Sequence, residues 1–158
     1  MRRFRRARGY SIVELLIVTV IILILASAIA PLSRVTIQRQ RETDLRRSLR
    51  ELRTAIDGYK DAVDLGVIGG TAVQAGSEGY PPDLETLVEG VEKLNDATGT
   101  KLRFLRRIPI DPLTRDREWG LRSYQDDADA SSWGGDSVYD VYTQARGTAL
   151  DGTRYRDW

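Results

Sequence analysis

The chain has 158 residues, with 24 Lys or Arg, 23 Asp or Glu, and neither His nor Cys, so its formal net charge is +1. This length suits one compact domain, and the balanced charge argues against a nucleic-acid-binding protein. Because imidazole and thiol are absent, Ser-His-Asp and Cys-His nucleophile systems, His- or Cys-ligated zinc and a disulfide framework are excluded.

The N-terminal part of the chain consists of a short positively charged segment followed by a long apolar segment. Five arginines stand within residues 2–8, and between Gly9 and Ser33 the only ionisable side chains are Tyr10 and Glu14. An apolar run then covers residues 15–30, and it reaches 21 residues when counted from Tyr10. At about 1.5 Å of rise per residue, a helix of that length matches the ~30 Å hydrocarbon core of a bilayer. The pattern predicts a segment that is inserted in a membrane during at least one stage of the protein's existence.

Three interpretations compete for this segment. A secretory signal peptide, releasing a small globular domain, would have A-x-A cleavage sites at residues 26–28 or 28–30. Pro31, directly after the second site, is unfavourable for cleavage of an extended backbone. A plain signal anchor is the second possibility. Neither explains the carboxylate of Glu14 at the start of the apolar run, which costs about 2.5 to 3.5 kcal/mol in hydrocarbon and therefore points to function.

The third interpretation rests on the residues around Glu14. The sequence Gly9-Tyr10-Ser11-Ile12-Val13-Glu14-Leu15-Leu16 follows an Arg-rich leader and resembles the prepilin signal of type IV pilins and type II secretion pseudopilins. The resemblance implies that a prepilin peptidase cuts after Gly9 and methylates the new amine of Tyr10, which replaces the usual Phe. It also implies that Glu14, the fifth residue after the cut, pairs with a neighbour's amine during assembly.

Residues 34–65 predict the amphipathic continuation of the same helix. Its apolar residues have the spacing 4, 3, 4, 3 and 4, which places them on one helix face: Leu45, Leu49, Leu52, Ile56, Tyr59 and Val63. Glu42, Glu51, Asp57, Asp61 and several arginines are assigned to the other faces. We expect the stripe to pack on the chain's own C-terminal domain, and the helix to bend at Pro31, where a backbone hydrogen bond is lost.

The remaining residues, 66–158, predict a small mixed domain. Gly66 and Gly69-Gly70 end the long helix, and Asp83 is the expected N-cap of a short helix. The apolar face of this helix is expected to contain Leu84, Leu87, Val88 and Val91. Strands are expected within residues 121–125 and 137–143, joined by a polar loop at residues 126–135.

Further landmarks extend the resemblance over most of the chain. Their order and approximate spacing are similar to those of the major pseudopilin of type II secretion: Gly79-Tyr80-Pro81, Ile108-Pro109, Asp111-Pro112, Trp119-Gly120, Asp140-Val141-Tyr142-Thr143, Asp151-Gly152 and Asp157-Trp158. The implied fold class is α+β, with a long N-terminal helix packed on a small antiparallel sheet and an irregular C-terminal loop. The implied organisation is a leader at 1–9, a transmembrane and filament-core half-helix at 10–33, an amphipathic half at 34–65, and a globular periplasmic or extracellular domain at 66–158.

Many members of that family hold Ca²⁺ in the C-terminal loop through adjacent acids before the final Trp. Here Thr153 and Arg154 take about that place, and an arginine opposes a cation that needs several oxygen ligands. Weak candidate ligands remain in the polar loop: Asp126, Asp127, Asp129 and Asp136. An EF-hand is excluded because Ser132 and Val138 replace its Gly and Glu. The simpler interpretation is a solvated acidic loop, so we expect no cofactor.

The combined interpretation is a structural subunit and not an enzyme, since the chain has no P-loop, dinucleotide fingerprint or nucleophile elbow. The resemblance implies a single-pass inner-membrane precursor with a cytoplasmic N-terminus, which assembles with copies of itself into a periplasmic pseudopilus or surface filament. The implied partners are the prepilin peptidase, an inner-membrane assembly platform, minor pseudopilins and membrane lipid. A minor or tip pilin that binds a ligand is the alternative.

Overall fold

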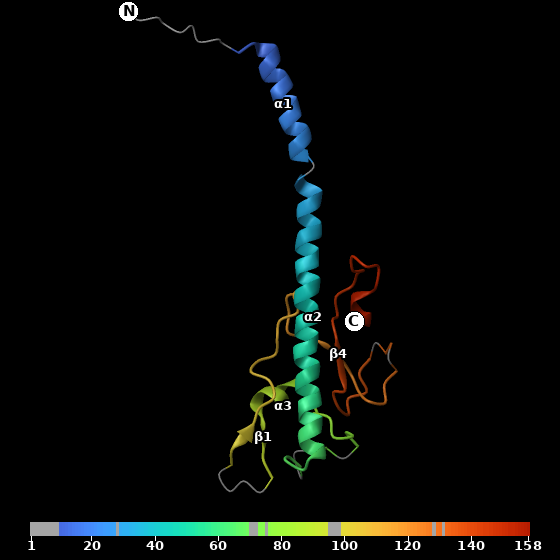
Figure 1. Ribbon diagram of the computed structural model, residues 1–158. Coiled ribbons are helices and arrows are strands. Elements are labelled where there is room, and N and C mark those ends of the chain that lie inside the picture. Colours follow the sequence, from blue (N-terminus) through green and yellow to red (C-terminus); the bar gives the residue numbers. More distant parts are fainter. Residues whose placement is uncertain are drawn as a thin grey trace, which may run out of the picture. The chain divides into compact units, whose positions relative to one another are not determined.

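The computed structural model describes residues 10–27, 29–69, 73–74, 76–94, 99–127, 129–130 and 132–158. The chain divides into two compact units, Met1–Gln38 and Arg39–Trp158. The first unit contains α1 (Ile12–Ser27) and the start of α2 (Ile29–Asp64), and the rest of α2 belongs to the second unit (Figure 1).

The helical segment begins with a cap from Ser11, whose Oγ accepts a hydrogen bond from the backbone N of Val13 at 3.3 Å. The first helix ends at Ser27, and α2 runs through Pro31. Proline has no N–H to donate to the carbonyl four residues earlier, which here belongs to Ser27. The bend expected at Pro31 stays a prediction.

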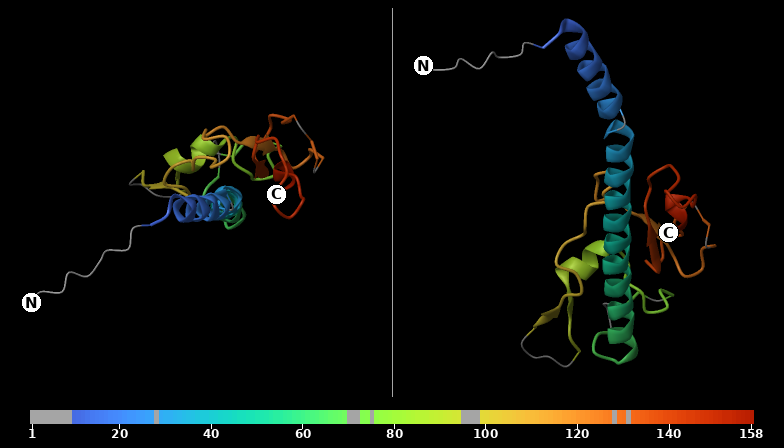
Figure 2. Two further views of the ribbon diagram at one scale, coloured as in Figure 1. Left: turned by 90° about the horizontal axis from the view of Figure 1, so that it is seen from above. Right: turned by 45° about the horizontal axis from the view of Figure 1, so that its top comes forward.

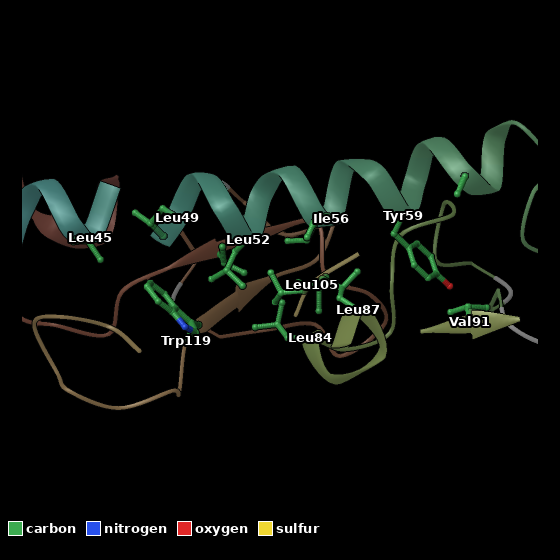
Figure 3. Close-up of a cluster of buried hydrophobic side chains, with 14 of the residues drawn as sticks. Leu45, Leu49, Leu52, Ile56, Tyr59, Leu84, Leu87, Val91, Leu105 and Trp119 are labelled. Carbon is green, nitrogen blue, oxygen red and sulfur yellow. The ribbon is translucent and has the colours of Figure 1, made fainter. Parts of the chain in front are cut away.

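The second half of α2 carries the core of the second unit. Leu45, Leu49, Leu52, Ile56 and Tyr59 are between 0 and 2% exposed, and Val63 packs against the same core. Figure 3 shows this stripe facing side chains from later in the chain, including Leu84, Leu87, Leu105 and Trp119. The prediction that the stripe packs on the chain's own domain is confirmed.

The short helix α3 (Leu84–Glu89) has the predicted cap. Asp83 Oδ1 accepts a hydrogen bond from the backbone N of Thr86 at 2.7 Å, and Leu84 and Leu87 are buried. The assignment of Val91 to this helix is wrong, because Gly90 ends α3 with a φ of 80°. Val91 instead begins β1 (Val91–Glu92), which pairs antiparallel with β2 (Lys101–Leu102), a hairpin that the sequence did not reveal.

A second two-stranded sheet is formed by β3 (Gly120–Arg122) and β4 (Asp140–Tyr142), which are antiparallel with Leu121 opposite Val141. Both strands fall at or beside the predicted positions but contain only three residues each. The irregular C-terminal loop that follows ends in a 3₁₀ turn, Tyr155–Asp157. Within the second unit, α3 and β1 lie toward one flank of α2, and β4 and the C-terminal segment lie toward the other (Figures 1 and 2). The α+β, pilin-like fold class is confirmed, with the strands divided between two small sheets.

Candidate functional site

The first helix exposes apolar side chains all around. None of its residues is buried, and the exposed fractions reach 82% at Ile12 and 66% at Leu25. Its two hydroxyls donate within the helix, from Thr19 Oγ1 to the Leu15 carbonyl and from Ser27 Oγ to the Ile24 carbonyl, both at 2.7 Å. The helix therefore offers an apolar surface whose two hydroxyl groups are already hydrogen bonded. A helix that is apolar on every side is normally surrounded by lipid or by other helices.

Glu14 lies in the first turn of α1, where a carboxylate is favoured by the helix dipole. Within the part of the chain that the structure describes, no hydrogen bond or ion pair involves its carboxylate. Tyr10 immediately precedes the capped helix and is 76% exposed. The predicted cleavage residue Gly9 and the leader arginines lie outside the described residues.

Later in α2, three side chains hold the C-terminal loop. Glu42 is only 9% exposed, and its Oε1 accepts hydrogen bonds from the backbone N of Leu150 and from Tyr155 Oη, both at 2.9 Å. One turn further along α2, Arg46 forms a 3.0 Å ion pair with Asp151. The placement of Glu42 on a solvent face is therefore wrong. Its position three residues before Leu45 continues the rhythm of the buried stripe, and that spacing was the available signal.

Arg53 is the third and most connected of these side chains. Its Nε donates to Asp140 Oδ1 at 2.7 Å, while its Nη2 donates to the carbonyls of Val141 at 3.1 Å and Trp158 at 2.8 Å. On the far side of Asp140, the buried guanidinium of Arg122 approaches Oδ2 at 3.5 Å. One carboxylate on β4 thus lies between two guanidinium groups, which joins the sheet, α2 and the loop. No sequence signal singled out Arg53 among the arginines of α2.

Asp111 is a second buried carboxylate that sequence reasoning did not assign. It is fully buried, and it accepts hydrogen bonds from the backbone N of Leu113 at 2.8 Å and from the hydroxyl of Thr143. Its Asp-Pro context marks a turn, and the carboxylate closes that turn and ties it to the residue after β4. This arrangement has a structural role because its described donors already satisfy the carboxylate.

The candidate calcium ligands do not converge on one position. Asp126 Oδ2 accepts hydrogen bonds from the backbone N of Ser123 at 2.7 Å and of Gly134 at 3.0 Å, which lower the pKa of its carboxyl. Asp127, Asp129 and Asp136 are exposed. Over the described ranges, no group of three or more acidic side chains is arranged to hold a metal ion. The structure assigns Asp126 to closing its own loop.

The structure also describes the surroundings of Thr153 and Arg154, the two residues just before the final turn of the chain. The Thr153 hydroxyl and backbone N both donate to Asp151 Oδ1, at 2.6 and 3.0 Å, and these bonds lower the pKa of the Asp151 carboxyl. Arg154 is exposed and precedes the 3₁₀ turn. The loop is therefore closed by an aspartate that accepts from Thr153 and pairs with Arg46.

Comparison with known proteins addresses the N-terminal segment. The family model of the prokaryotic N-terminal methylation motif matches residues 4–30. The chain carries a prepilin-type N-terminal motif. This motif supports a type IV pilin-like or pseudopilin relationship, processing by prepilin peptidase, and a structural role in a filament. No curated protein and no solved structure matches the chain. Among the described residues, none of the helices combines the length and apolarity needed to cross a membrane.

Proposed function

We propose that this protein is a structural subunit of a type II secretion pseudopilus, held as a precursor in the inner membrane, cut after Gly9, methylated on Tyr10 and assembled into a helical filament. The observation that supports the proposal is the methylation motif at residues 4–30, which includes the exposed and predominantly apolar helix α1 with Glu14 in its first turn. The folded second unit would decorate the filament. The apolar helices of neighbouring copies would form its centre.

Assembly would be favoured because α1 replaces its contacts with lipid by contacts with the helices of neighbouring copies. In the membrane, the carboxylate of Glu14 costs about 2.5 to 3.5 kcal/mol. In the filament, the methylated amine of a neighbour's Tyr10 would compensate that charge. Each subunit would then supply one anion and one cation to a repeating chain of contacts, which favours an open helical assembly.

Processing is tested first. The absence of a side chain at Gly9 lets the backbone enter a protease site closely. We expect mass spectrometry of the wild-type chain to show an N-terminus at methylated Tyr10, and Gly9→Val to leave the precursor uncut. A mature chain beginning at Ser27 or later would overturn the proposal and favour a secretory signal peptide.

Assembly is tested by removing only the charge of Glu14. We expect Glu14→Gln to be cleaved and retained in the membrane while filaments disappear, because breaking one side of a buried pair costs about 3 to 5 kcal/mol. Glu14→Asp should be intermediate, since the charge is kept with a shorter reach. The matched control is Asp44→Asn, an exposed carboxylate on α2. Normal filaments built from Glu14→Gln chains as the sole subunit would contradict this role and favour a tip subunit.

The type of filament needs a separate observation. Genes for a secretin and a secretion ATPase beside this one would favour the secretion pseudopilus, and their absence beside a pilus adhesin gene would favour a surface pilus. A minor subunit is distinguished by stoichiometry, because sheared filaments would contain it in a small proportion relative to another pilin.

A further inference from the structure

An open hollow of about 620 Å³ lies beside β3 and β4 in the second unit. Three aromatic rings and three guanidinium groups line it, and none of its lining residues is acidic: Trp119, Trp133, Tyr142, Arg146, Arg154 and Arg156. A concave surface with three positive charges and no carboxylate is an unusual composition in a chain whose acidic and basic residues are nearly equal in number. It suggests recognition of a negative group.

The positive charges of the hollow are not neutralised by carboxylates within the described residues. Arg146 and Arg154 are exposed, and neither forms an ion pair there. Arg156 Nη2 donates to the carbonyls of Asp129 and Ala130, both at 3.3 Å, which position it without cancelling its charge. The three guanidinium groups therefore retain their electrostatic attraction for an anion.

Aromatic rings supply the rest of the wall. The Tyr142 ring has the Arg122 guanidinium at 4.3 Å from its centroid and that of Arg156 at 5.7 Å. Trp133 is 39% exposed, and its Nε1 donates to the Ser137 carbonyl at 2.8 Å, so the indole is oriented while part of it remains accessible. An oriented, exposed ring beside cations favours a ligand that combines a flat group with a negative one.

We propose that this hollow binds an oxyanion, a phosphate or carboxylate group, attached to a ring that packs on Trp133. Planar guanidinium groups match such oxyanions through paired N–H donors, and several of them repel a divalent cation. The ligand is either a soluble molecule or the headgroup of an acidic lipid whose phosphate is attached to a ring, as in a phosphoinositide. Both present the same ring-linked oxyanion to the hollow. The site belongs to the second unit alone, so it does not depend on the proposed filament role.

The experiment is calorimetric titration of the full chain in a neutral detergent at fixed ionic strength, with phenyl phosphate and with inorganic phosphate. We expect saturable binding of both and tighter binding of phenyl phosphate. Arg154→Gln and, independently, Arg146→Gln should each weaken binding about tenfold, the size expected for a charge-assisted hydrogen bond. The matched control is Arg50→Gln, an exposed arginine on α2 outside this hollow. Trp133→Ala should remove the preference for phenyl phosphate and leave inorganic phosphate bound.

Absence of saturable binding would overturn the proposal, and so would an equal loss in Arg50→Gln and Arg154→Gln, which would indicate general charge attraction. Circular dichroism of each variant confirms folding, and the two independent arginine variants keep the test valid if one of them is unstable. The source of the ligand is resolved by competition with water-soluble dihexanoyl phosphatidylinositol, whose headgroup joins a phosphate to a ring. Displacement of phenyl phosphate supports a lipid headgroup in this site, and failure to displace it supports a soluble ligand.

Discussion

At the level of single residues, Glu42 connects α2 to donors more than 100 positions later in the chain. The backbone N of Leu150 and Tyr155 Oη both donate to its Oε1. We expect Glu42→Ala to lower the free energy of unfolding by about 1 to 3 kcal/mol, because the buried hydroxyl of Tyr155 loses its acceptor. Chemical unfolding of the full chain in detergent measures this loss. Asp44→Ala, at an exposed position two residues on, should stay within about 0.5 kcal/mol of wild type. Equal losses in the two variants would contradict the contact.

Replacement of glycine by alanine should have opposite effects on stability at Gly120 and at Gly58. A Cβ added at Gly120 would lie 2.3 Å from the Tyr142 ring, whereas one at Gly58 would meet only Phe104 Cδ1 at 3.6 Å. We expect Gly120→Ala to destabilise the protein by about 1 to 3 kcal/mol through overpacking. Gly58→Ala should stabilise it by about 0.5 to 1 kcal/mol, because Gly58 lies inside α2. A melting temperature of Gly120→Ala at or above that of wild type would show that the local space around Tyr142 is not limiting, and a lowered melting temperature of Gly58→Ala would contradict the prediction for α2.

At the level of elements, the sequence predicts best where the pattern is local. The buried stripe of α2 follows from the 3 and 4 spacing alone, since a helix places such residues on one face. The cap at Asp83 follows from one side chain and the backbone three residues later. The boundaries of the strands did not follow, because three-residue strands are defined by partners elsewhere in the chain. From its residue type, Val91 could belong either to the short helix or to a strand. It lies in β1 because Gly90, with a φ of 80°, ends α3 just before it.

The candidate functional residues also fall into a group that local sequence can predict and a group that depends on distant contacts. Residues 9–14 form a contiguous motif, so the sequence alone can nominate Gly9, Tyr10 and Glu14, whose roles stay predictions. The contacts of Arg53 join residues 87 to 105 positions apart, and the chain contains many other arginines of equal local character. Only the three-dimensional structure selects this one. The Arg-lined hollow also gathers residues from separate loops, which no spacing rule brings together.

The two loops closed by Asp126 and Asp151 predict how stability responds to acid. Backbone bonds from Ser123 and Gly134 lower the pKa of Asp126, and bonds from Thr153 lower that of Asp151, both below the ordinary 3.8. Because the unfolded chain binds protons more readily, stability is fully present above that pH and is lost as pH falls through the folded-state pKa values. We expect the melting temperature to fall below about pH 4.

The variants Asp126→Asn and Asp151→Asn should flatten this acid dependence, because each removes one group that takes up a proton on unfolding. Thermal melts of the full chain between pH 3 and pH 7 measure the effect. Asp44→Asn is the control and should retain the wild-type slope. An unchanged slope in both loop variants would show that other carboxylates cause the acid sensitivity.

At the level of the whole molecule, removal of residues 1–9 would reverse the sign of the net charge. The five leader arginines reduce the basic side chains from 24 to 19 against 23 acidic ones, which leaves −4. The precursor has a sequence pI near 8.0, so we expect the mature chain to focus well below pH 7. Isoelectric focusing of wild type beside uncut Gly9→Val measures the difference. Equal focusing positions would indicate that the leader is retained.

The attachment of the C-terminal loop to α2 has a kinetic consequence. Glu42 and Arg53 receive partners 105 to 113 residues later, and contacts this distant in sequence form slowly. At a synthesis rate of about 5 to 20 residues per second, α2 would wait roughly 5 to 20 seconds for these partners to emerge. Until then Glu42 lacks both of its donors, and Arg53 lacks the Trp158 carbonyl that it binds in the folded chain. The contacts that fasten the C-terminal loop to α2 are therefore among the last to form, and they cannot form before Trp158 has been synthesised.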